Sequence, residues 1–91
     1  MSYSKESALS KARHDLAQRL GVNEHDIREG SVEETDFPDT SLGAGTDDEM
    51  SGQMMTRGWR IKLEAQGQTF EYRADKNQVR AYKFNGKNYK I

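Results

Sequence analysis

The pattern of hydrophobic and polar positions divides the chain into a first part with helical spacing and a second part with strict alternation. In the first part, apolar residues recur every three or four positions, which places them on one face of a helix over residues 5–20. Ser4 precedes this segment as a helix N-cap, and Gly21 follows it as a residue able to end the helix in the left-handed conformation. The apolar face consists of Leu9, Ala12, Leu16 and Leu20.

In the second part, bulky residues occupy every other position, which is typical of strands with one buried face. The dipeptide Asn85-Gly86 favours a type I′ hairpin turn and predicts a last strand over residues 87–91. The alternation loses its phase near Tyr82. The three preceding runs cover residues 59–64, 69–73 and 79–84.

A short turn and a further strand lie between the helix and these runs. Asn23 is a good cap, so we expect one helical turn after it, with Ile27 pointing into the core. Residues 28–36 have the composition of a strand, but their low apolar content indicates an edge or half-exposed position. Pro38 ends this strand because it cannot donate a hydrogen bond to a sheet.

These segments together predict an α+β fold, with one N-terminal helix packed on a three- to five-stranded antiparallel sheet. The 91 residues fit a single domain spanning residues 1–91. Charged residues make up 32% and hydrophobic residues 33% of the chain, so we expect a thin core.

The longest interruption is a loop at about residues 38–56, which holds most of the turn-forming residues. Loops of this length in a compact domain are usually functional or disordered. Methionine side chains adapt to irregular surfaces and serve well at promiscuous contacts. We therefore expect Leu42, Met50, Met54 and Met55 to contact a partner or to dock the loop on a thin core.

The net charge of −1 conceals a split between two regions. Residues 23–49 carry ten acids and one base, whereas residues 57–91 carry nine bases and three acids. We expect the two regions to neutralise each other and the bases of the C-terminal strands to be solubilising. Alternatively, bases interleaved with Tyr82, Phe84 and Tyr89 could bind single-stranded nucleic acid by stacking and phosphate contact.

Candidate chemistry is sparse. The chain has no cysteine, which excludes disulfides, thiolate catalysis and cysteine-based zinc sites. We interpret His14 and His25 as structural or solvated, and the contiguous acids at 47–49 lack the alternation of a calcium loop. No nucleophile motif or phosphate-binding glycine loop occurs. We therefore expect no enzymatic activity, no metal and no cofactor.

No apolar run approaches the roughly 20 residues that span a bilayer. Residues 1–6 lack the apolar stretch of a secretory signal. We expect a cytoplasmic monomer that does not bind membranes.

Three short motifs follow one another along the chain: Leu20-Gly21-Val22, Asp39-Thr40-Ser41-Leu42-Gly43 and Gly58-Trp59-Arg60-Ile61-Lys62-Leu63. Their order and spacing resemble those of a group of small bacterial proteins that are similar to PepSY-type modules. The resemblance covers about residues 8–75 and implies a helix packed on a small antiparallel sheet. Where many members of the group carry Cys-Pro, this chain has Ala44-Gly45, so any role of that cysteine is absent.

Three functional hypotheses stay open at this point. The first is a non-enzymatic module that binds another protein or regulates it through the long loop. The second is a peptidase-inhibitor or propeptide-like domain, which the PepSY resemblance implies. The third is a weak single-stranded nucleic-acid binder, although we do not expect nucleic acid because the whole domain is not basic.

Overall fold

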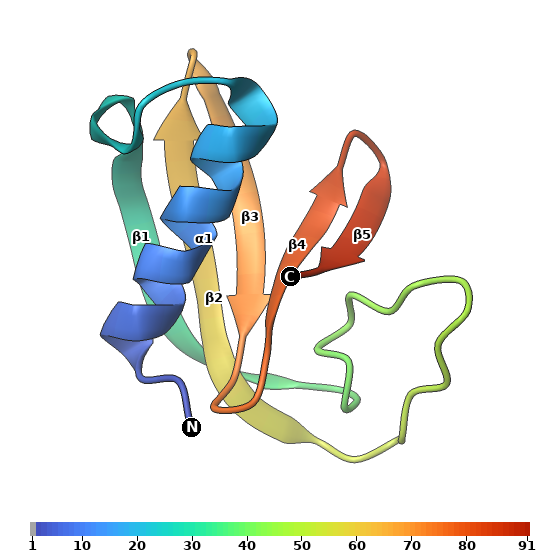
Figure 1. Ribbon diagram of the computed structural model, residues 1–91. Coiled ribbons are helices and arrows are strands. Elements are labelled where there is room, and N and C mark those ends of the chain that lie inside the picture. Colours follow the sequence, from blue (N-terminus) through green and yellow to red (C-terminus); the bar gives the residue numbers. More distant parts are fainter. Residues whose placement is uncertain (1) are drawn as a thin grey trace.

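The computed structural model describes residues 2–91, which form one α-helix, a short 3-10 turn and one antiparallel sheet (Figure 1). The five strands follow the order β1-β2-β3-β4-β5, so each strand pairs with its neighbour in sequence. This confirms the predicted α+β class, with one helix packed against a five-stranded antiparallel sheet. The elements are α1 (Lys5–Leu20), η1 (Glu24–Asp26), β1 (Arg28–Phe37), β2 (Thr56–Ala65), β3 (Gln68–Ala74), β4 (Val79–Phe84) and β5 (Lys87–Lys90).

The ends of α1 have the predicted caps. The Ser4 hydroxyl accepts a hydrogen bond from the N–H of Ser7, and the Ser7 hydroxyl accepts one from the N–H of Ser4. This reciprocal arrangement is a capping box, in which two unsatisfied donors of the first turn find partners. At the other end, Gly21 takes φ +69°, and its N–H donates to the carbonyl of Ala17.

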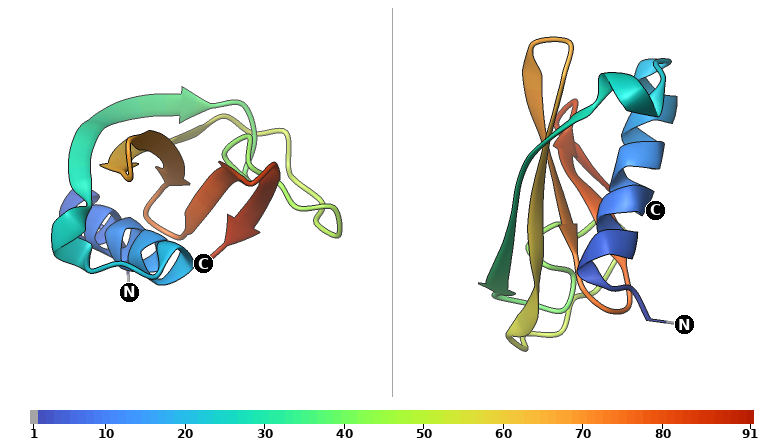
Figure 2. Two further views of the ribbon diagram at one scale, coloured as in Figure 1. Left: turned by 90° about the horizontal axis from the view of Figure 1, so that it is seen from above. Right: turned by 90° about the vertical axis from the view of Figure 1, so that its left-hand side faces the viewer.

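The helix lies across one face of the sheet (Figure 2). Its fully buried positions are Ala8, Ala12 and Leu16, while Leu9 and Leu20 are only partly buried beside them. The buried stripe is therefore shifted from the predicted one and is richer in alanine. Small side chains let the helix approach the strands closely, so the inward residues of the sheet fill the space between the two layers. Those residues are Ile61, Leu63, Ala65, Tyr72, Ala74, Val79 and Ala81.

A polar contact crosses this otherwise apolar layer. The buried Tyr72 hydroxyl donates to Asp15 at 2.8 Å, and Asp15 also accepts from Nε of Arg19 at 2.6 Å. Burial, helped by the hydrogen bond to the Asp15 carboxylate, raises the pKa of Tyr72 above its usual range. The tyrosine therefore stays neutral and joins helix to sheet. The Arg19 guanidinium in turn covers the rings of Phe84 and Tyr89, at 5.3 and 4.2 Å from their centroids.

The C-terminal hairpin explains why the alternation loses its phase near Tyr82. The β4–β5 pairing shifts register between Ala81 and Phe84, and Lys83 has φ +52°. This irregularity lets Phe84 pack on the helix side against Phe70, with 5.7 Å between ring centroids. In the turn, Asn85 and Gly86 both have positive φ, as the type I′ hairpin requires.

Strand β1 is an edge strand, as its low apolar content predicts, and its partner β2 contains Gly58 at a point of close contact. A Cβ atom added at Gly58 would lie 2.1 Å from the carbonyl oxygen of Ala74 and 3.2 Å from the ring of Phe37. Only glycine therefore allows β2 and β3 to approach here. This is the physical reason for a glycine directly before the aromatic residue of this strand.

We predict that Gly58→Ala lowers the free energy of unfolding by about 2–3 kcal/mol, because the backbone must move to relieve the clash. Urea unfolding followed by circular dichroism measures the loss. Gly86→Ala is the matched control: nothing lies within 4 Å of its added Cβ, so only its positive φ is strained, by about 1 kcal/mol. Equal losses in the two variants would contradict the close-approach argument.

Candidate functional site

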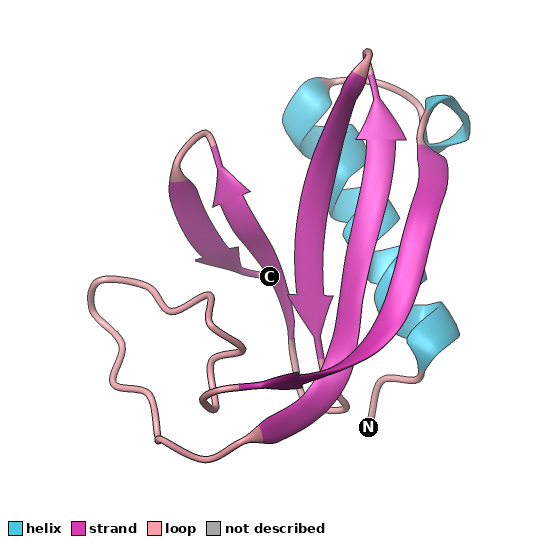
Figure 3. Cartoon of the chain, turned by 180° about the vertical axis from the view of Figure 1, so that it is seen from behind, coloured by secondary structure: helices cyan, strands magenta, loops and turns pink. Residues whose placement is uncertain are grey.

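The connection between β1 and β2, residues 38–55, lies beside the β4–β5 hairpin at the lower end of the sheet (Figure 3). It contacts Arg73 and Arg80, which alternate along β3 and β4 with the residues that face α1. We call it the methionine loop. It contains no helix or strand, yet its backbone is fixed by side chains of the sheet at several points. Pro38 follows Phe37, the last residue of β1, so the strand ends where the sequence predicts.

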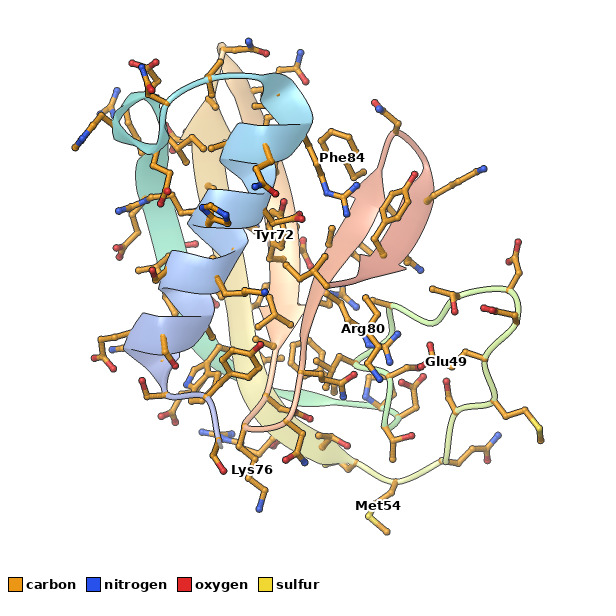
Figure 4. All side chains as sticks on the ribbon, in the orientation of Figure 1. Glu49, Met54, Tyr72, Lys76, Arg80 and Phe84 are labelled. Carbon is orange, nitrogen blue, oxygen red and sulfur yellow. The ribbon has the colours of Figure 1, made fainter. Side chains whose placement is uncertain are left out.

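The central contact is an ion pair with a buried arginine. Arg80 on β4 is 2% exposed, and its guanidinium donates to the two carboxylate oxygens of Glu49 at 2.6 and 2.5 Å (Figure 4). It also donates to the Ala44 carbonyl at 3.2 Å and to the Gln78 side chain at 2.6 Å. The hydrogen bond from Arg80 holds the pKa of Glu49 at about 2, against the opposing effect of burial.

A second arginine holds the start of the loop. Arg73 donates to the Leu42 carbonyl at 3.0 Å, and its guanidinium lies 3.6 Å from the centroid of the Tyr82 ring. Its Nε donates to Glu71 at 2.7 Å. The side chain of Leu42 is fully buried, so this candidate residue docks the loop and is not available for contact with a partner.

The Asp-x-Ser-Leu-Gly motif forms a tight turn around Asp39. Its carboxylate accepts hydrogen bonds from the N–H of Gly43 at 2.9 Å, and from the N–H and hydroxyl of Ser41, both at 3.0 Å. These donors, with Gly43 the largest contributor, lower the pKa of Asp39. Leu42 and Gly43 have φ of +61° and +67°, which turns the chain sharply onto the sheet.

The two arms of the loop are also joined to each other. The N–H of Thr40 donates to the Gly52 carbonyl at 2.9 Å, and the N–H of Gly52 donates to the Thr40 hydroxyl at 2.8 Å. The hydroxyls of Ser41 and Ser51 form a further hydrogen bond. Met50 lies between the anchored residues Glu49 and Ser51, and it is 99% exposed.

Met54 and Met55 are 68% and 70% exposed. They line a hollow of about 640 Å³ at the end of the sheet, together with the half-buried Trp59. We call this hollow the methionine groove, and Met50 is not among the residues that line it. Its complete lining is Thr40, Met54, Met55, Thr56, Arg57, Trp59, Asp75, Lys76, Asn77 and Gln78.

The groove has one unpaired cation at its rim. The Arg57 guanidinium binds Glu34 at 2.7 Å and Asp36 at 3.2 Å, so its charge is balanced. Lys76 is exposed and forms no ion pair with a side chain of residues 2–91. Figure 4 shows Met54 and Lys76 at the same end of the molecule. Asp75, beside Lys76, is buried, and its carboxylate accepts hydrogen bonds from the N–H groups of Asn77 and Gln78. The site therefore combines the apolar surface of Met54, Met55 and Trp59 with polar neighbours and an exposed ammonium group at the rim.

The structure separates residues that the sequence analysis grouped together. Leu42 is buried, whereas Met50, Met54 and Met55 are exposed, so the methionines do not pin the loop to the core. The expectation that the C-terminal bases are solubilising is wrong for Arg73 and Arg80, which hold the loop. Sequence analysis also missed the turn at residues 75–78 as a groove wall, because nothing local brings it near residue 54.

A family model described as "Domain of unknown function (DUF8738)" matches residues 9–82, which include most of α1, the methionine loop and Arg80. The chain belongs to this family. Searches of curated proteins and of solved structures found no match. The matched region of this DUF8738 member contains both the groove and the arginines that hold it.

Other site chemistry is sparse in the described part of the chain. Within residues 2–91, no group of three or more His, Asp or Glu side chains is placed to hold a metal ion. Nδ1 of His14 lies 3.0 Å from a carboxylate oxygen of Glu24, and both side chains are about half exposed. No helix in residues 2–91 is long and apolar enough to cross a membrane.

We predict that the Glu49–Arg80 pair makes the free energy of unfolding depend on pH. The pKa of Glu49 falls from 4.5 to about 2 on folding, so its contribution is present above pH 4.5 and is lost as the pH falls towards 2. Because Glu49 is partly exposed, we expect its charge to contribute about 1–2 kcal/mol to the free energy of unfolding. Glu49→Gln should be less stable than wild type by this amount near pH 6.

Urea unfolding at about pH 6 and about pH 2.5 measures this effect, and the gap between wild type and Glu49→Gln should narrow at the lower pH. Asp47→Asn, an exposed neighbour in the same loop, controls for removal of a negative charge. A gap that does not change with pH would show that the Glu49 charge does not stabilise the fold.

Proposed function

We propose that this chain is a non-enzymatic protein-binding module, and that the methionine groove receives an apolar side chain of the partner. The observation that carries the proposal is the exposure of Met54 and Met55 beside Trp59, on a loop whose backbone is anchored to the sheet. A monomeric soluble domain gains nothing in stability from leaving such side chains in water, and clustered exposed apolar residues mark interaction sites.

The anchored backbone favours binding because it lowers the entropy lost on association. Contacts with Arg80 and Arg73 and the Thr40–Gly52 hydrogen bonds hold the loop up to Gly52, and β2 begins at Thr56, so Met54 and Met55 lie on a short segment held at both ends. Only the methionine side chains then need to be ordered by a partner. Flexible thioether side chains can adapt to partners of different shape, which suits a site formed by few residues.

Lys76 gives the groove a preference for a partner that carries a negative charge. Its free ammonium group lies at the rim of an apolar hollow. A partner segment that places a carboxylate next to a large apolar side chain would satisfy both features at once. We therefore propose an acidic, apolar protein segment as the occupant, with the carboxylate giving orientation more than affinity.

The structure favours a protein partner over single-stranded nucleic acid. Stacking on a base requires an open aromatic face. In this chain, the Arg73 guanidinium lies over the Tyr82 ring, and the Arg19 guanidinium covers Phe84 and Tyr89. The aromatics of the basic strands are thus already stacked on the chain's own arginines.

A selection from a phage-displayed random peptide library tests the proposal. We expect enriched peptides to share a large apolar residue close to an acidic one. The double variant Met54→Asp/Met55→Asp should weaken their binding at least about tenfold, measured by calorimetry. Lys76→Gln should weaken it about threefold, an effect that disappears at high salt because it is electrostatic.

Met50→Asp is the control for position, since it adds one of the two negative charges of the double variant to the same loop outside the groove and should leave the affinity unchanged. If the partner is a peptidase, the wild-type protein should slow substrate cleavage by at least one member of a panel of peptidases. Failure to enrich any peptide, or equal affinity for wild type and the double variant, would refute the proposal.

A further inference from the structure

All sulfur atoms of the described chain lie on the methionine loop. The sequence has no cysteine and four methionines, of which Met50, Met54 and Met55 fall within the described residues. Their side chains are 99%, 68% and 70% exposed, and no methionine is found among the core residues. Within residues 2–91, any oxidant that reacts with sulfur must therefore react at this surface, and the product need not disturb the core.

We propose that Met54 and Met55 are oxidation sites whose conversion to the sulfoxide closes the methionine groove to its partner. The chemistry is a two-electron oxygen transfer from a peroxide. The thioether sulfur attacks one peroxide oxygen, an S–O bond forms, the O–O bond breaks, and the leaving oxygen departs as water or an alcohol after taking up a proton. Methionine is oxidised and the peroxide is reduced, and sulfoxide reductases reverse the reaction at the expense of thiols.

The position of the two residues decides the consequence. Met54 and Met55 supply the flexible apolar part of the groove lining, opposite the turn at residues 75–78 and beside Trp59. A sulfoxide is polar and accepts hydrogen bonds, so an oxidised lining would retain water in place of an apolar side chain. The loss of partner binding rests on the proposed function, whereas the change in the groove itself does not.

Met50 provides an internal reference for this inference. It is the most exposed of the three methionines, but it does not line the groove. Exposure alone would make Met50 react as readily as the other two. Oxidation of Met50 should nevertheless leave the groove unchanged. A change in the groove can then be assigned to oxidation of Met54 and Met55, which line it, and not to the total number of oxidised sulfur atoms.

The chain contains a built-in reporter of this event. Trp59 is its only tryptophan, and it lines the groove with Met54 and Met55. The experiment treats the full chain with hydrogen peroxide, maps the oxidised residues by mass spectrometry, and follows Trp59 fluorescence. We expect the emission of Trp59 to change as Met54 and Met55 are oxidised, and to return after reduction by the two sulfoxide reductases.

Leucine variants identify the residues responsible, because leucine matches methionine in volume and does not oxidise. Met54→Leu/Met55→Leu should abolish the fluorescence change, whereas Met50→Leu should retain it. The urea unfolding midpoint should be the same before and after oxidation. A lowered midpoint, or unchanged fluorescence with both sulfurs oxidised, would overturn the inference.

Binding is measured separately with a peptide from the library selection. Oxidation should weaken that peptide at least about tenfold in wild type, and should have no effect in Met54→Leu/Met55→Leu. Unchanged affinity after oxidation would remove the regulatory part of the inference. If no peptide binds the unoxidised protein, the proposed function fails, and fluorescence and mass mapping still decide whether oxidation alters the groove.

Discussion

The rest of the structure depends on the hydrogen bonds and the ion pair of Arg80, whose guanidinium group is buried on the sheet face opposite the helix. A charge in this position is tolerated only if its donors find acceptors and its charge finds a partner. Gln78 meets one donor from within the sheet, but Glu49 and the Ala44 carbonyl must come from the loop. The loop is consequently held against the sheet, and everything it carries takes a defined position.

The two faces of the sheet are therefore covered by different physical means. The helix covers one face with alanine and leucine, and the hydrogen bond from Tyr72 to Asp15 joins it to the sheet. The loop covers part of the other face through arginine contacts. Acidic residues of the first half meet basic residues of the second at Glu49–Arg80 and Glu34–Arg57, which is the neutralisation expected from the charge pattern.

This division also explains how apolar side chains come to be exposed on an ordered segment. A loop held mainly by apolar contacts would bury its methionines. This loop buries Leu42 and Ala44 and is otherwise held by polar contacts with Arg73 and Arg80. The three methionines are therefore exposed, and Met54 and Met55 line the groove together with Trp59. Order in the backbone and freedom in the side chains are the combination that an adaptable binding surface needs.

The sequence by itself determined the helix, its caps, the approximate extents of the strands and the Asn85-Gly86 turn, because each depends on residues close together in the chain. The start of β2 at Thr56, three residues before the predicted start, was not among them. The sequence also indicated that residues 38–56 form an unusually long loop, and that the methionines of this loop contact a partner or dock the loop on the core. Only the tertiary structure decided that Arg80 holds the loop, that Leu42 is buried and that Trp59 joins Met54 at a groove. The reason is physical: the partners of Arg80 and Arg73 lie about thirty positions away in sequence, and no local pattern records such contacts.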